Sequence, residues 1–186
     1  PMQTIAGVIE NIDMELEKIS PDAVLILGDT NSSLSAIPAK RRKIPIFHME
    51  AGNRCFDFRV PEEINRRIVD VISDINLTYS EIARQYLISE GFEKNRVINT
   101  GSPMKEVINF YSDKINASKI LKELNIEKNK YFLVSVHREE NVDNKAKLKS
   151  LPEILNKLSK DFMLPVIVST HPRAKKMIKQ SKLEFS

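Results

Sequence analysis

The chain has 186 residues, of which 41% are hydrophobic and 29% charged, a composition typical of a globular protein and not of a disordered or fibrous one. No apolar run approaches the roughly 20 residues of a membrane-spanning helix, no secretory signal pattern opens the chain, and a single cysteine, Cys55, rules out an internal disulfide framework. With a net charge of only +4 and no aromatic residues interleaved with the lysines, we expect a soluble, cytoplasmic protein with no membrane or nucleic-acid partner.

Hydrophobic patterning alternates between helical and strand-like along the first part of the chain. Apolar residues recur with helical spacing over residues 4–19, and the continuous apolar run 23–27 is typical of a strand buried in a parallel sheet. Gly91 lies where a helix cap belongs, Pro61 opens a helix at a tolerant position, and Pro38 suggests a kink. The same alternation predicts helices over 31–42, 61–73 and 80–90, and strands over 45–49, 75–79 and 96–100.

A second alternation follows a polar helical stretch at 103–124. It predicts a strand at 130–136, a helix at 145–160, a strand at 165–169 and then a short basic helix. Strands that alternate with helices imply an α/β fold with parallel sheets and right-handed crossovers. The expected division is most of one Rossmann-type domain at 1–110, a linker at 111–116 and the first part of a nucleotide-binding Rossmann-type domain at 117–186. We read the chain as a fragment incomplete at both ends.

Polar side chains follow the predicted strands where they end. Asp29 comes after the first strand, Glu50 after the second and Ser102 after the fourth, while His137 and His171 follow the two strands of the second domain. In open parallel sheets, ligands bind beyond the carboxyl ends of the strands. Two such domains side by side would place all five residues around one cleft.

Each acidic candidate also has a plain structural interpretation. Asp29 could cap the following helix, and Glu50, which is costly to bury unpaired, could form an ion pair with Arg54. The helix dipole favours glutamates in a first helical turn, so helix chemistry alone accounts for one glutamate of the run "PEE". Glu62 and Arg66, four residues apart, could form an ordinary surface pair.

The strand ends of the second domain suit phosphate binding. Arg138 follows His137 directly and Arg173 lies close to His171, and a guanidinium group can contact two phosphate oxygens at once. The three histidines and Cys55 do not fall in metal-ligand spacings, and there is no GxGxxG, Walker or G-x-S-x-G motif. We therefore expect no metal ion and no cofactor.

Five short motifs together carry a family resemblance. "GDTNS", "HMEAGNR", "PEEINRR", "TGSP" and "HREEN" occur in this order over nearly the whole chain. In order and spacing the chain resembles the non-hydrolysing UDP-N-acetylglucosamine 2-epimerases, including the branch that acts on related UDP-N-acetyl-hexosamines. The resemblance implies a glycosyltransferase-B-like pair of Rossmann-type domains with a nucleotide-sugar between them. It also implies inversion at C2 by elimination and re-addition of UDP, without nicotinamide or metal, by an enzyme that is commonly a homodimer.

The resemblance assigns roles to individual residues. The family's acidic catalytic set matches Asp29, Glu50 and Glu62, and its catalytic histidine matches His137. Arg138 and His171 match positions that hold the nucleotide or a second, regulatory nucleotide-sugar. We further expect Arg54, Ser102 and Arg66 to bind substrate.

The second-domain motifs depart from the commoner family pattern. That pattern reads HRREN, then one residue and a glycine, whereas Glu139 here replaces the second arginine and Asp143 the glycine. "HPR" stands where many members have H-x-N-P. These differences favour the branch that makes L-fucosamine or mannosamine precursors for polysaccharides.

The chemistry of the residues agrees with this assignment. Removing the C2 proton of a sugar needs a base beside a weak acid, and a carboxylate in a dry cleft can serve, although spacing does not decide which carboxylate is the base. UDP leaves as an anion, which helix N-termini and Arg138 would stabilise. A glycosyltransferase with a UDP-sugar donor and a binding-only UDP-sugar module are the alternatives, and the fragment alone is expected to be inactive.

Overall fold

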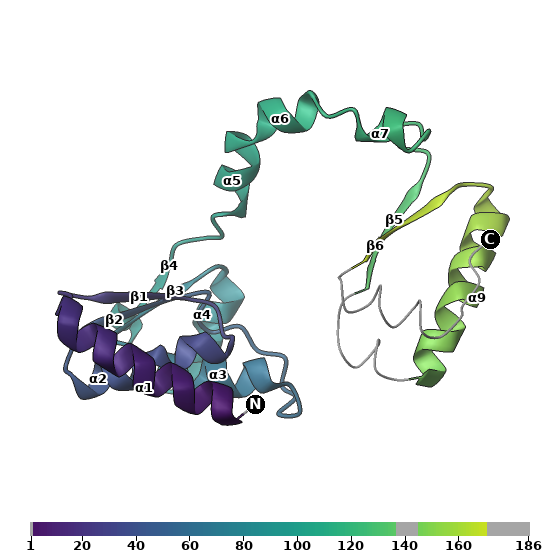
Figure 1. The fold of residues 1–186 in the computed structure, drawn as a ribbon. Coiled ribbons are helices and arrows are strands. Elements are labelled where there is room, and N and C mark those ends of the chain that lie inside the picture. The colour runs from purple at the N-terminus through teal and green to yellow at the C-terminus, as the bar shows by residue number, and fades with distance from the viewer. Residues whose placement is uncertain (1, 137–144, 171–186) are drawn as a thin grey trace. The chain divides into compact units, whose positions relative to one another are not determined.

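The computed structural model describes residues 2–136 and 145–170 and divides the chain into two compact units, Pro1–Phe110 and Tyr111–Ser186. The first unit is a parallel sheet with helices on one face (Figure 1). Its elements are α1 (Met2–Ile19), β1 (Val24–Leu27), η1 (Asn31–Ser35), α2 (Ala36–Arg41), β2 (Ile46–Met49), α3 (Pro61–Ile72), β3 (Ile75–Thr78), α4 (Glu81–Ser89), η2 (Lys94–Arg96), β4 (Val97–Asn99) and α5 (Met104–Phe110).

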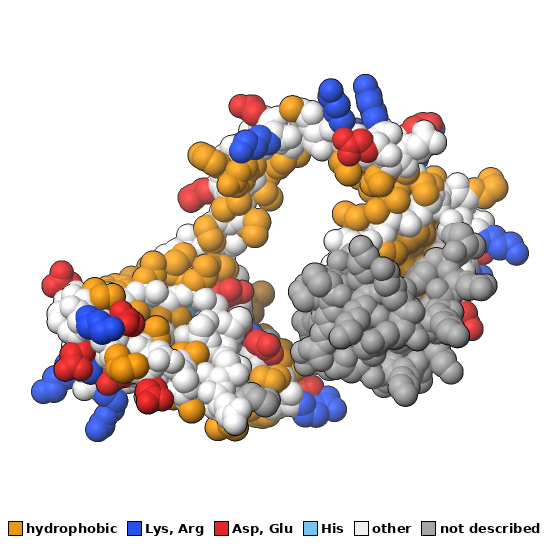
Figure 2. Space-filling view, viewed as in Figure 1, with side chains coloured by type: hydrophobic (Ala, Val, Ile, Leu, Met, Phe, Trp, Pro, Cys, Tyr) orange, Lys and Arg blue, Asp and Glu red, His pale blue; other side chains and the backbone are white. Residues whose placement is uncertain are grey.

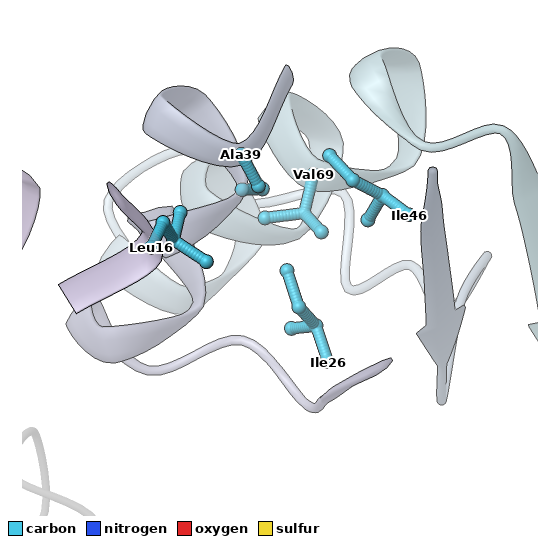
Figure 3. Close-up of a cluster of buried hydrophobic side chains, with 6 residues drawn as sticks. Leu16, Ile26, Ala39, Ile46 and Val69 are labelled. Carbon is cyan, nitrogen blue, oxygen red and sulfur yellow. The ribbon is translucent and has the colours of Figure 1, made fainter. Parts of the chain in front are cut away.

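The strand order of this sheet explains why the helices share a face. The four strands lie in the order β1-β2-β3-β4, all parallel, and crossovers of one hand between successive neighbours put their helices on the same side. There Leu16 of α1, Ala39 of α2 and Val69 of α3 pack against Ile26 and Ile46 of the strands (Figure 3). A second cluster joins α4 to β4 through Ala51, Leu87 and Val97.

Side chains on the other face of this sheet are exposed. Leu25 and Leu27 of β1 are each 64% exposed, and Ile98 of β4 is 47% exposed. Figure 2 shows hydrophobic side chains gathered over the strands of this unit. The core of the first unit therefore lies entirely between the sheet and its helices.

Local signals set the helix boundaries as the sequence predicts. Pro61 occupies the first turn of α3, where no partner is needed for the missing N–H. Ser80 caps α4 by accepting a 3.2 Å hydrogen bond from the amide of Ala83, and Gly91 follows the end of that helix with φ 97°. The expected helix 31–42 is divided into η1 and α2, so that Pro38 lies in the first turn of α2 and does not kink a longer helix.

The second unit pairs two parallel strands. Three short helices, α5 of the first unit together with α6 (Ser112–Asn116) and α7 (Ile120–Glu123) of the second, take the place of the polar helical stretch expected at 103–124. Strand β5 (Phe132–Val136) pairs with β6 (Val166–Thr170), and α9 (Lys145–Phe162) connects towards β6. Phe132 and Phe162 meet edge to face with ring centroids 5.4 Å apart. In the described parts of the chain, no helix combines the length and the apolar character needed to cross a membrane.

The turn that follows β2 is unusually constrained. Glu50 has φ 69° and Gly52 has φ 77°, in the left-handed region that side chains disfavour. A Cβ atom on Gly52 would lie 2.5 Å from the carbonyl oxygen of Ala83 and 2.9 Å from Cγ of Leu87. Only glycine therefore allows helix α4 to pack directly on this turn.

The close approach at Gly52 predicts a large cost for Gly52→Ala. The change should destabilise the chain by about 1 to 2 kcal/mol through backbone strain and by a further 1 to 3 kcal/mol, roughly, through overpacking. Gly101→Ala is the matched control, because Gly101 has φ 74° and open space around its Cβ position, so only the strain remains. Urea unfolding measures both, and equal losses would show that the contact with α4 does not matter.

Candidate functional site

The carboxyl ends of β1 and β2 bring two predicted acidic residues side by side. Leu27 and Met49 are register partners, and Gly28 and Glu50 follow them. The amide of Gly28 donates to the carbonyl of Met49 at 3.2 Å. A Cβ atom on Gly28 would lie only 3.6 Å from Oε2 of Glu50. Glu50 therefore stands beside the turn that carries Asp29.

Asp29 is held by a guanidinium group from α3. Its Oδ2 accepts hydrogen bonds from Nε of Arg66 at 2.8 Å and from Nη2 of the same side chain, and its backbone carbonyl accepts from Nδ2 of Asn65 at 3.0 Å. The helix-cap interpretation does not hold, because Thr30 takes the N-cap position of η1. With its side chain 18% exposed, Asp29 has a fixed direction at an accessible edge.

Glu50 has a different environment. The ion pair that its position suggested with Arg54 is not formed, since Arg54 bonds elsewhere, and no cation among the described residues lies within salt-bridge distance of Glu50. Its Oε1 lies 3.5 Å from Nδ2 of Asn53. Burial, followed by the negative charge of Glu50, raises the pKa of the Tyr79 phenol. Glu50 therefore lacks, among the described residues, the guanidinium contacts that hold Asp29.

The two adjacent glutamates of α3 have opposite environments. Glu63 is fully buried and accepts from Arg66 Nη1 and Arg67 Nε, both at 2.9 Å, and from the Cys55 amide at 3.1 Å. Burial alone would raise the pKa of Glu63, but the Cys55 amide and the Arg67 guanidinium hold it below its usual range. Glu62 is exposed in the first turn of the helix.

The surface pair suggested for Glu62 and Arg66 is replaced by a bridge. Arg66 joins Asp29 to Glu63 and also donates to the carbonyl of Asn53 at 2.9 Å. The structure thus brings Asp29, Glu50 and Arg66 together through Asn53. It places Glu62 one helical turn before Arg66.

A buried carboxylate, Asp70, lies behind the Glu50 turn. It accepts from Arg54 Nη1 at 2.7 Å and from the amide of Gly52 at 3.3 Å, and its Oδ1 lies 2.8 Å from Nδ1 of His48. Arg54 continues to Glu90 with contacts of 2.8 and 2.6 Å. The three nitrogens of Arg54 are therefore bonded inside the fold, and substrate contact by this residue stays a prediction.

The remaining predicted residues divide between the two units. Ser102 is exposed, and its Oγ accepts a 3.3 Å hydrogen bond from the amide of Met104 at the start of α5. His137, Arg138 and His171 lie outside the described residues. Within residues 2–136 and 145–170, no three histidine, cysteine, aspartate or glutamate side chains are grouped as metal ligands.

Several residues of the site were missed by the sequence reasoning. Tyr79 follows the third strand of the sheet, so the strand-end rule that selected Asp29 and Glu50 could have found it. Glu63 and Asp70 lie seven positions apart on α3, which puts two acids on the buried face of one helix. That spacing was the available signal.

The ion pairs around Arg54 predict an acid-dependent stability. The hydrogen bond from Arg54 holds the pKa of Glu90 below its usual range, so its stabilisation is complete above the unfolded pKa of about 4.3 and is lost as the pH falls through the lower folded value. Glu90→Gln should therefore destabilise the chain by about 1.5 to 3 kcal/mol at neutral pH and by almost nothing in strong acid.

Urea unfolding between neutral and acid pH measures this difference. Glu15→Gln is the control, because Glu15 pairs with Lys18 on the surface and should contribute less than about 1 kcal/mol. A deficit of Glu90→Gln that stays constant with pH would contradict the assignment.

Comparisons with known proteins agree with the motifs. A family model described as UDP-N-acetylglucosamine 2-epimerase matches residues 1–185. The chain is similar to the solved UDP-N-acetylglucosamine 2-epimerase of Rickettsia bellii, with TM-score 0.90 and 54% identity over 99% of this chain and 48% of that one. It is similar to Methanocaldococcus jannaschii UDP-GlcNAc 2-epimerase in complex with UDP-GlcNAc and UDP, with TM-score 0.86 and 35% identity over 96% of this chain and 50% of that one.

A relative named for a different sugar is also similar. UDP-2,3-diacetamido-2,3-dideoxy-D-glucuronate 2-epimerase of Pseudomonas aeruginosa is 35% identical over 92% of this chain and 49% of that protein. The chain spans about half the length of the relatives it matches. These similarities confirm the predicted glycosyltransferase-B-like α/β class with parallel sheets. On the match of the family model over residues 1–185, the chain belongs to the UDP-N-acetylglucosamine 2-epimerase family.

Proposed function

We propose that the complete protein converts UDP-N-acetylglucosamine to UDP-N-acetylmannosamine, or epimerises a closely related UDP-N-acetyl-hexosamine at C2. The observation that carries this proposal is the pair of carboxylates at the ends of β1 and β2, with Asp29 fixed by Arg66 and Glu50 without a cationic partner in the described parts of the chain. Family membership and a relative solved with UDP-GlcNAc and UDP support it. In this proposal the enzyme is a cytoplasmic homodimer that needs no cofactor or metal and supplies precursors for polysaccharides.

The reaction is an elimination followed by a re-addition. A carboxylate takes the C2 proton, the electrons of the C2–H bond form the C1=C2 double bond, and the C1–O bond breaks as UDP leaves with its electron pair. Re-addition of UDP to C1 and protonation of C2 from the opposite face give the epimer. Each step needs only proton transfer and stabilisation of the leaving phosphate.

The geometry favours Glu50 as the group that moves the C2 proton. Asp29 already accepts two hydrogen bonds from Arg66, whereas the side chain of Glu50 has one long contact, with Asn53, within residues 2–136 and 145–170. Asp29 suits the orientation of substrate at the same edge. Glu62, in the first turn of α3, is proposed as the third acid of the set.

The other half of the site is proposed from the resemblance alone. His137 would be the fourth catalytic residue. Arg138 and His171 would bind the nucleotide, and Ser102 and Arg54 would contact substrate. Arg66 acts in this proposal through Asp29.

NMR of UDP-GlcNAc incubated with the complete protein in deuterated water tests the proposed function. We expect a second UDP-sugar to appear without any acceptor, with deuterium at C2 in both epimers, because the C2 proton is exchanged with solvent at the base. A glycosyltransferase would leave the donor unchanged or hydrolyse it slowly. A binding module would leave UDP-GlcNAc unchanged and without deuterium. The result expected for a glycosyltransferase or for a binding module would overturn the proposal.

Amide variants test the three acids individually. Asp29→Asn, Glu50→Gln and Glu62→Gln should each lower C2 deuterium exchange by about 100-fold or more, as expected for loss of an acid or base. Glu93→Gln is the matched control, since Glu93 is an exposed glutamate that precedes β4 at the opposite edge of the sheet. Wild-type exchange in any of the three variants would remove that residue from the catalytic set.

A further inference from the structure

We propose that Asp70 is the positioning residue for Glu50: a carboxylate that does not reach substrate holds the turn from which Glu50 projects at the end of β2. The inference rests on the proposed function, because it treats Glu50 as the group that moves the C2 proton. Asp70 lies in the last turn of α3 and is fully buried. It acts on the site only through the groups that it bonds.

The backbone at Glu50 requires such a support. Its φ of 69° is left-handed, a conformation that is unfavourable for a residue with a side chain. Such a conformation persists only where surrounding contacts fix it. One contact is the 3.2 Å hydrogen bond from the amide of Ala51 to the carbonyl of Leu77.

Asp70 supplies contacts on both sides of Glu50. Two residues after it, the amide of Gly52 lies 3.3 Å from each Asp70 oxygen, and Arg54 donates to Asp70 at 2.7 Å. Two residues before it, Nδ1 of His48 lies 2.8 Å from Asp70 Oδ1. One side chain on a rigid helix therefore bonds both ends of the turn.

His48 extends the same support to the first strand. Its Nε2 lies 3.1 Å from the carbonyl oxygen of Gly28, the residue before Asp29. The two ring nitrogens of this buried imidazole thus lie between the Asp70 carboxylate and the Gly28 carbonyl. Asp70 thus connects the turn of Glu50 with the turn of Asp29.

Burial makes these bonds hard to replace. His48 and Asp70 have no exposed side-chain surface, and the side chain of Arg54 is 1% exposed. Water cannot take the place of a lost partner there, so a change at Asp70 must be absorbed by a shift of the groups around it. Within that set, the Glu50 turn is the part that Asp70 bonds directly and that carries a proposed catalytic group.

Asp70→Asn in the complete protein tests the proposal. The amide keeps the shape but removes the charge and directs an NH2 group at donors. We expect kcat for C2 exchange to fall by about 10- to 100-fold, as for residues that orient a reacting group, while KM for UDP-GlcNAc changes by less than about 3-fold. A fall in kcat of less than about 3-fold would overturn the proposal.

Asp74→Asn is the matched control. Asp74 also accepts from a cation and a backbone amide, Lys40 at 2.6 Å and Ile46 at 2.9 Å, but at the amino end of the strands. The same chemical change there should lower stability and leave kcat within about 2-fold of wild type. If both variants lose the same activity, Asp70 is merely structural.

A double-mutant cycle separates positioning from general damage. If Asp70 acts through Glu50, adding Asp70→Asn to Glu50→Gln should lower the residual exchange rate by less than about 2-fold. Multiplication of the two single effects would overturn the proposal. Should Asp70→Asn fail to fold, Asp70→Glu keeps the charge, displaces the carboxylate by one methylene and should show the same split between kcat and KM.

Amide hydrogen exchange measures how firmly the Glu50 turn is held, and it needs no activity assay. The Gly52 amide should exchange at least about 10-fold faster in Asp70→Asn than in wild type, and at the wild-type rate in Asp74→Asn. If the wild-type protein epimerises neither UDP-GlcNAc nor a related UDP-N-acetyl-hexosamine, the proposed function fails, and the exchange rate of the Gly52 amide by itself decides whether Asp70 holds the turn. An unchanged Gly52 rate in Asp70→Asn would overturn it.

Discussion

The buried carboxylate of Asp70 is the contact on which the geometry of the first unit's carboxyl edge depends. A buried charge is costly unless its hydrogen-bonding capacity is filled, and here Arg54, His48 and the Gly52 amide fill it. The hydrogen bonds that offset the cost of burying the Asp70 carboxylate also hold it in one position. Turns that would otherwise be free to relax are fixed to helix α3, and with them the direction of Glu50.

Four carboxylates in the stretch from His48 to Asp70 are of two kinds. Glu63 and Asp70 are fully buried and bonded to arginines, whereas Glu50 and Glu62 are accessible and have no ion pair among the described residues. The buried pair organises the loops, and the accessible pair is available for chemistry. This division explains why a short connection between a strand and a helix contains so many charges, since a simple turn could link the elements but could not hold reacting groups in place.

The proposed reaction places modest demands on such an edge. It needs a base near C2, a donor of the returning proton and stabilisation of a leaving phosphate, and none of these depends on the substituents at C3 or C6 of the sugar. The relatives fit this view, because one is named for UDP-N-acetylglucosamine and another for a diacetamido-glucuronate. An edge of this kind suits a family with several UDP-hexosamine substrates.

The sequence by itself determined the order of helices and strands, the parallel α/β class and the family, because hydrophobic periodicity, caps and short motifs are local signals. It also selected Asp29 and Glu50, since the strand-end rule needs only the position of a residue along the chain. Tertiary structure decided the partners: Arg54 pairs with Asp70 and Glu90 instead of Glu50, and Arg66 pairs with Asp29 and Glu63 instead of Glu62. A long arginine side chain can reach several carboxylates at similar sequence distance, so its partner depends on which turns the packed helices bring near, and spacing in the chain does not contain that information.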